Sequence, residues 1–67
     1  MNEEYIKSLC EYQISLIATK HKLMAAYGNV DRLIDKTHEE IQRLSEGGVY
    51  VTYDGKIIDE KGVLNGK

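Results

Sequence analysis

The residues that could carry chemistry in this chain are two histidines, one cysteine and several acids. His21 and His38 are its only histidines, and a shared divalent metal is the chemistry that such a pair would support. Both lie at a similar distance from the turn of a helical hairpin, but they project from different sides of it. Catalytic zinc usually takes three protein ligands, and no third is evident. The sequence therefore predicts no metal site and no cofactor.

Cys10 is the single cysteine, so neither an intrachain disulfide nor a multi-cysteine zinc site can form. A nucleophilic cysteine needs a nearby base and electropositive surroundings. Cys10 instead stands between Leu9 and Glu11 on the apolar flank of a predicted helix. We interpret it as a buried core thiol, which fits a reducing compartment.

Acidic residues gather in the second half of the helical region, at Asp31, Asp35, Glu39 and Glu40. A carboxylate pair for acid–base catalysis needs one member removed from water. Basic residues are interleaved with these acids, which indicates a solvated helix face. Neither Gly47-Gly48 nor Asp54-Gly55 belongs to a longer phosphate-binding pattern. The sequence thus predicts no catalytic residue and a protein that is not an enzyme.

The net charge is −2, with nine Lys and Arg spread among eleven Asp and Glu. Non-specific binding of nucleic acid needs clustered positive charge, so this balance argues against it. The polar, acidic start and the lack of an apolar run of about 20 residues predict neither a leader nor a membrane span. We therefore expect a cytoplasmic protein that makes no membrane contact.

The elements that position these residues begin with a predicted helix over residues 2 to about 27. Apolar positions recur at spacings of four and three, as in a coiled coil: Tyr5, Leu9, Tyr12, Leu16, Thr19, Leu23, Ala26 and Val30. Ile6, Cys10 and Ile17 run beside this seam, so the apolar face is wide enough for more than one neighbour.

Gly28-Asn29 predicts the break between this helix and a second one from about residue 30 to residue 45. Gly47-Gly48 ends the second helix, and a turn this short favours two antiparallel helices. The alternative is one bent helix that passes through residue 28, at the cost of a glycine inside a helix.

Residues 49 to 60 change to an alternating pattern, and Asp54-Gly55 between β-forming residues predicts a β-hairpin. A two-residue turn there would place Tyr53 opposite Lys56, Thr52 opposite Ile57 and Val51 opposite Ile58. Residues 61–67 are predicted to be a loose tail, to which Val63 and Leu64 could add a short third strand.

The predicted fold class is mostly α with a small β element (α+β), as a single domain over residues 1–67. An antiparallel helical hairpin is followed by a C-terminal β-hairpin. The second helix can cover only about Ile14 to Tyr27 of the first, which leaves the first three turns as an overhang. We expect the C-terminal hairpin and a second subunit both to contribute to covering this overhang. Because a chain of 67 residues buries a modest core, we expect self-association as added support.

The sequence predicts a small interaction or regulatory protein that acts as a homo-oligomer and through contact with another protein. Its size and plan suggest a phage or mobile-element accessory protein that binds a host factor. The residues expected to mediate self-association are Tyr5, Leu9, Tyr12 and Leu16. Those expected to bind the partner are Tyr50, Thr52, Tyr53 and Ile57.

Two alternatives stay open. One is a dimeric, nucleic-acid-linked regulator in which dimerisation aligns Lys20, Lys22, Arg32 and Lys36 across two subunits. The other is a small-ligand binder whose cavity forms between subunits, with His38 and tyrosine side chains at its wall.

Overall fold

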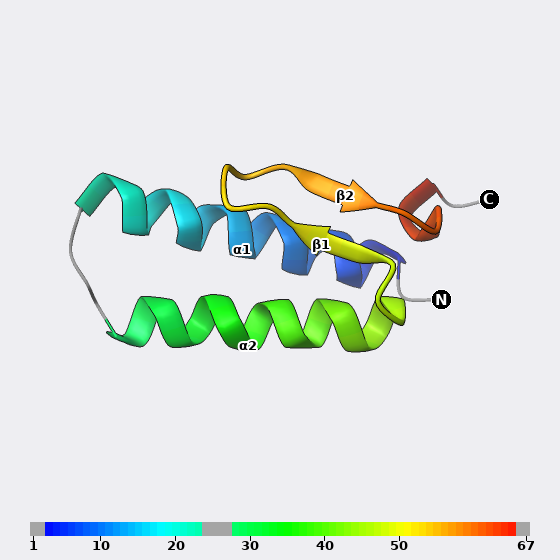
Figure 1. Ribbon diagram of the computed structural model, residues 1–67, viewed down its shortest axis with the longest axis horizontal. Helices are drawn as coiled ribbons and strands as arrows, with labels where there is room; N and C mark the ends of the chain where they lie inside the picture. The colour runs from blue at the N-terminus through cyan, green and yellow to red at the C-terminus, as the bar shows by residue number, and fades with distance from the viewer. Residues whose placement is uncertain (1–2, 24–27, 66–67) are drawn as a thin grey trace.

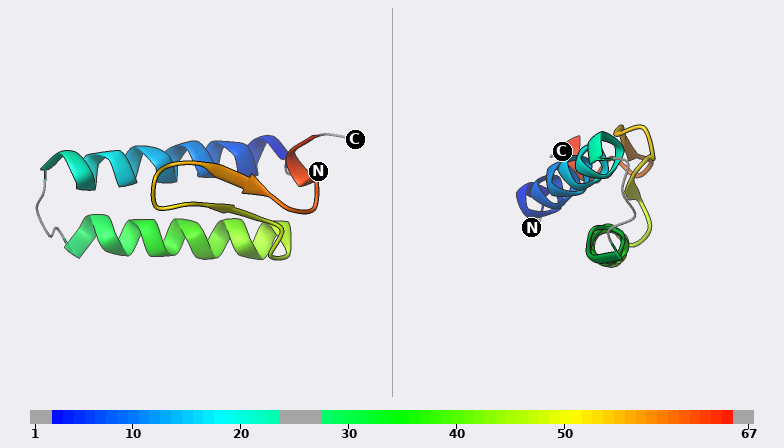
Figure 2. Two further views of the ribbon diagram at one scale, coloured as in Figure 1. Left: turned by 45° about the horizontal axis from the view of Figure 1, so that its top comes forward. Right: turned by 90° about the vertical axis from the view of Figure 1, so that its left-hand side faces the viewer.

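The computed structural model describes residues 3–23 and 28–65. Two antiparallel helices lie side by side, and a two-stranded ribbon runs lengthwise along one side of the pair (Figures 1 and 2). The elements in chain order are α1 (Glu3–Leu23), α2 (Gly28–Ser45), β1 (Val49–Val51), β2 (Ile57–Asp59) and the 3₁₀ helix η1 (Val63–Asn65). The predicted α+β class, with a helical hairpin and a β-hairpin, is confirmed.

The predicted break at Gly28-Asn29 is wrong in its position, because both residues belong to the first turn of α2. The predicted end of the first helix falls on residues 24–27, which lie outside the described residues. Acidic side chains occupy the first turn of α1 at Glu3 and Glu4, and basic ones its last turn at Lys20 and Lys22. Each charge thus complements the helix dipole at its own end of α1.

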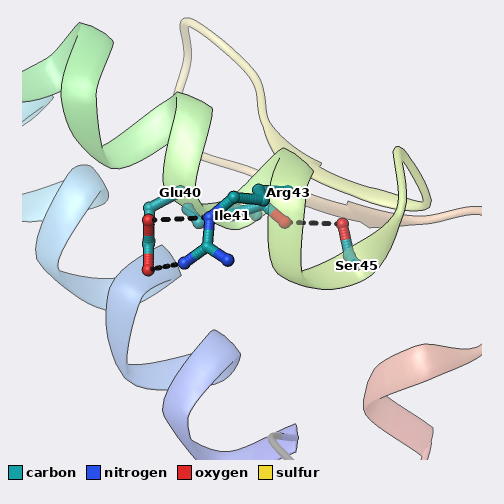
Figure 3. Close-up of polar contacts among 4 residues, drawn as sticks. All are labelled: Glu40, Ile41, Arg43 and Ser45. Atoms are coloured by element: carbon teal, nitrogen blue, oxygen red, sulfur yellow. Dashed lines mark hydrogen bonds and ion pairs between the residues drawn. The ribbon is translucent and has the colours of Figure 1, made fainter.

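The end of α2 is joined to β1 by a compact set of hydrogen bonds around Ser45. The Ser45 hydroxyl donates to the carbonyl of Ile41 at 2.7 Å (Figure 3) and accepts the backbone N–H of Val49 at 3.1 Å. Gln42 Nε2 donates to the carbonyl of Val49 at 2.7 Å. Gly47, at φ 80°, donates its N–H to the Gln42 carbonyl, which closes the helix end. These bonds fix where the ribbon starts on α2.

The ribbon is an antiparallel hairpin whose register is shifted by one residue from the predicted one. Val51 pairs with Ile57 and Tyr50 with Ile58, so the predicted pairing of Val51 with Ile58 is wrong. The reason is a three-residue loop, in which the N–H of Thr52 donates to the carbonyl of Lys56 at 2.8 Å and Gly55 adopts φ 87°. A shift of one residue exchanges the two faces of a strand, so Ile57 packs against the core.

The core lies between the two helices and the inner face of the ribbon. Its buried apolar residues are Ile6, Cys10, Ile17, Ile41, Val49 and Val51. Tyr5 and Tyr12 of the predicted seam do not belong to this core, because they are 52% and 47% exposed. The buried stripe is displaced by one residue, about 100° round the helix. The cause is that α1 must face α2 and the ribbon together, and the flanking residues Ile6, Cys10 and Ile17 point between them.

The predicted overhang of the first helix is also wrong. Lys20 Nζ lies 2.6 Å from Asp31 Oδ1, and this ion pair sets the level of α2 against α1. Because α2 begins early and has 18 residues against 21 in α1, its last turns reach the beginning of α1. Cys10 and Ile41 are both fully buried at that end. The first turns of α1 thus have a partner within the chain.

The segment after β2 is ordered through residue 65, in place of the predicted loose tail or third strand. Val63 and Leu64 belong to η1 and pack against the buried core. Lys61 Nζ donates to the carbonyl of Glu46 at 2.8 Å. These contacts tie the end of the ribbon to the beginning of α1 and to the end of α2.

Candidate functional site

The four residues predicted to mediate self-association follow one line along α1. Tyr5 and Tyr12 are exposed, and Leu9 and Leu16 are half-buried. The ribbon lies on the opposite side of α1. Ile14 lines a cavity together with Tyr53 of the hairpin, and nine residues separate Ile14 from Tyr5, which is about half a turn round the helix. These four residues therefore share one side of α1, about half a turn round the helix from Ile14 and the ribbon.

Leu33 of α2 is 40% exposed and belongs to the same uncovered side of the helix pair. Asp31 and Asp35 contribute to a cavity with Tyr53, so they mark the ribbon side of α2. Leu33 is two residues from each of them, about 200° round the helix. We name this surface the outer helical face, and its residues are Tyr5, Leu9, Tyr12, Leu16 and Leu33.

The four residues predicted to bind a partner do not share one face. Ile57 packs on the core, and Tyr50, on the opposite face of the ribbon, places its hydroxyl 3.5 Å from a Glu60 carboxylate oxygen. The Thr52 hydroxyl donates to Asp54 and accepts the N–H of Lys56, so it closes the loop. Tyr53, at the loop, is 66% exposed. The predicted contact surface therefore reduces to Tyr50 and Tyr53.

Tyr53 separates two hollows on the ribbon side of the molecule. The first has a volume of about 350 Å³ and is largely apolar, and its lining residues are Ile14, Ile17, Ala18, His21, Tyr53, Asp54 and Gly55. The rings of His21 and Tyr53 meet edge to face in it, with centroids 4.7 Å apart. His21 thus packs on an aromatic ring.

The second hollow lies between both helices and β1, and we name it the Gln13 cavity. Its volume is about 510 Å³, and its lining residues are Gln13, Ile17, Lys20, Asp31, Ile34, Asp35, Val51 and Tyr53. Gln13 is only 3% exposed, and its Oε1 has no hydrogen-bond partner among the described residues. The sequence interpretation missed Gln13. The available signal was its spacing, three residues after Cys10 and four before Ile17, which places an amide in a buried stripe.

Cys10 is buried, whereas His21 and His38 are exposed and belong to different helices. Burial, followed by the negative charges of Glu11 and Asp59, raises the pKa of the Cys10 thiol, so the reactive thiolate is disfavoured. Within residues 3–23 and 28–65, no three His, Cys, Asp or Glu side chains come together as a metal site. The shared level predicted for His21 and His38 is wrong, because the Lys20–Asp31 pair sets His21 about eight α2 residues from His38, roughly 12 Å.

The four basic residues of the nucleic-acid alternative are not equivalent. Lys20 is engaged by Asp31, and that hydrogen bond raises the pKa of Lys20. Lys22, Arg32 and Lys36 are exposed. One of the four positive charges is thus neutralised within the chain.

Comparison of the chain with protein-family models, with curated proteins and with solved structures gives no match. Neither of the described helices combines the length and the apolar content that a membrane crossing requires.

Proposed function

We propose that this protein is a non-enzymatic interaction protein that self-associates through the outer helical face. The proposal is supported by the position of the large apolar side chains that stay exposed in the folded chain. Four large hydrophobic side chains are exposed among the described residues, and three of them, Tyr5, Tyr12 and Leu33, lie on this face. Apolar surface gathered on one side of a small protein is typical of a contact site.

A second copy of the chain is the occupant that fits this face. Two such faces related by a two-fold axis would form a four-helix arrangement, with each ribbon on the outside. The tyrosines would bury their rings there while their hydroxyls reach the rim.

The residues that border the outer helical face would allow a second copy of the chain to come close. Ser8 and Ser15 are small, exposed and spaced seven residues apart, like Tyr5 and Tyr12. On α2, Arg43 Nη2 donates to Glu40 at 2.6 Å and Arg43 Nε at 3.3 Å (Figure 3). The Glu40 carboxylate is therefore paired within its own chain, and a second copy does not have to supply a cation for it.

The experiment is sedimentation-velocity ultracentrifugation of the full chain over a range of micromolar concentrations. We expect a dimer that dissociates on dilution and a thermal midpoint that rises with concentration. Tyr12→Lys should give a folded monomer, because a charge would be buried at the centre of the contact. Tyr53→Lys is the matched control, since Tyr53 is exposed on the ribbon side. A wild-type monomer at high micromolar concentration would reject the proposal.

A contact with another protein, in a regulatory role, is the second part of the proposed function. Its support is Tyr53, at the hairpin loop, which is the most exposed large hydrophobic side chain among the described residues. Aromatic side chains of this kind are enriched at the centres of protein contacts. The test is affinity capture from candidate hosts with the wild type and with Tyr53→Ser. A partner retained equally by both variants would exclude this surface.

A further inference from the structure

The Gln13 cavity lies within one chain, between the two helices and β1. We infer that it binds a small organic cation that carries N–H donors on a flat apolar body. A volume of about 510 Å³ is in the range of pockets that hold small molecules. The inference rests on three features of the cavity: an unpaired amide, an excess of carboxylates and an apolar wall.

The unpaired amide is that of Gln13. Its side chain is 97% buried, and its Oε1 accepts no hydrogen bond from the described residues. Buried polar atoms in proteins are almost always paired, so this oxygen calls for a donor. The last torsion of a glutamine side chain is soft, which lets the amide turn its oxygen toward a donor in the cavity. A ligand N–H would supply that donor.

The charges on the wall favour a cation over an anion. Asp31 and Asp35 contribute two carboxylates, and Lys20 contributes one ammonium. The ammonium of Lys20 is already held by Asp31 at 2.6 Å. Asp35 therefore remains to pair with a positive charge, whereas a bound anion would meet an unbalanced carboxylate.

The apolar part of the cavity wall favours a ligand with a flat, apolar body. Ile17, Ile34 and Val51 present aliphatic surface, and Tyr53 presents an aromatic ring. A flat ring can lie against this wall, and a cation above the Tyr53 face gains a further electrostatic attraction. Ile17 and Tyr53 also line the apolar 350 Å³ hollow, so the wall continues beyond the Gln13 cavity. An aromatic amidinium or guanidinium has the required combination of donors, charge and flat surface.

The test is titration of the ¹⁵N-labelled full chain with benzamidine, followed by amide chemical shifts. Benzamide and benzoate are the comparators, because they keep the ring and remove or reverse the charge. We expect saturable shifts around Gln13, Asp35 and Val51 with benzamidine, affinity about tenfold weaker for benzamide, and no saturable shifts with benzoate. Equal affinity for all three compounds, or no saturation with benzamidine at millimolar concentration, would overturn the inference.

Two variants locate the site. Gln13→Met keeps nearly the same volume and removes the amide, and Asp35→Asn removes the free carboxylate. Each should weaken benzamidine about tenfold, whereas Glu39→Gln, an exposed acid that does not line the cavity, should bind as the wild type does. Unchanged affinity in Asp35→Asn would reject the site even if Gln13→Met failed to fold. The monomeric Tyr12→Lys variant should still bind, so failure of self-association and failure of this site are distinguishable.

Discussion

Asp59 holds Leu64 through a 2.8 Å hydrogen bond from the Leu64 backbone N–H to the Asp59 carboxylate. The other oxygen of the same carboxylate accepts the N–H of Val63, also at 2.8 Å. Asp59 thus ends β2 and caps η1, whose apolar side chains pack against the core near Cys10. One side chain therefore controls how firmly the end of the chain covers the beginning of α1.

Removing this cap should expose the buried thiol. In Asp59→Ala, η1 loses both side-chain acceptors, and we expect it to detach more often from α1. The reaction of Cys10 with a thiol reagent in native buffer should then become several times faster than in the wild type. Asp59→Asn keeps one acceptor oxygen and should give an intermediate rate. An unchanged rate in Asp59→Ala would mean that other contacts protect Cys10.

Acid should weaken the same contact. Burial alone would raise the pKa of Asp59, but the backbone N–H groups of Leu64, Val63, Gly62 and Lys61 outweigh it and hold this pKa below its usual value. A carboxyl whose pKa is lower in the folded state contributes stability above its unfolded pKa and loses it as pH falls through the folded pKa. Urea unfolding from about pH 6 to about pH 2 should show this loss, and a smaller one in Asp59→Asn. Equal acid sensitivity of both proteins would contradict the assignment.

The hairpin loop depends on the left-handed backbone of Gly55. A Cβ there would meet only Ile14 Cγ2 at 3.8 Å, an ordinary contact, so the cost of a side chain is conformational. Gly55→Ala should lower the free energy of unfolding by about 1–2 kcal/mol, and Gly55→Asn by less, because Asn tolerates this conformation. Chemical denaturation measures both. Equal losses would show that steric contact, and not φ 87°, sets the cost.

Gln13 should be a site where an apolar residue stabilises the fold. A buried acceptor without a donor costs about 1–3 kcal/mol, and Gln13→Met removes it with little change in volume. We therefore expect the unfolding free energy of Gln13→Met to rise by about 1 kcal/mol without ligand. Destabilisation by this substitution would show that the amide has a partner in solution.

Ile41 tests the core itself, since it is fully buried between α1 and the ribbon. Ile41→Ala should cost about 2–5 kcal/mol, through lost burial and the cavity left behind. For a domain of this size such a loss approaches the whole stability. Leu33→Ala on the same helix is the control, because Leu33 is 40% exposed and its truncation should cost far less in the monomer.

Local signals in the sequence predicted the elements well. Gly47-Gly48 marked the end of the second helix, and Asp54-Gly55 marked the hairpin loop, because turn residues act through their own backbone preferences. The register failed because the Thr52 hydroxyl accepts the N–H of Lys56 and stabilises a longer loop. That contact competes with the two-residue turn, and the dipeptide signal does not report it.

Relations between elements were harder to predict. The seam through Tyr5 and Tyr12 has regular spacing, and so does the stripe beside it through Ile6 and Cys10. Spacing alone does not tell which of these two stripes packs against both α2 and the ribbon. The Gln13 cavity was missed because a glutamine does not count as a core residue in a pattern of apolar positions. Its burial is decided by α2 and β1 together, which lie far from it in sequence.

The contact between α1 and η1 also determines where the two ends of the described chain lie. The beginning of α1 and the 3₁₀ helix η1 lie at the same pole of the molecule, beside the end of α2 (Figures 1 and 2). Polypeptides joined to the two ends of the described chain would therefore start near the same pole. A connection between two such polypeptides need not span the 39 Å length of the molecule.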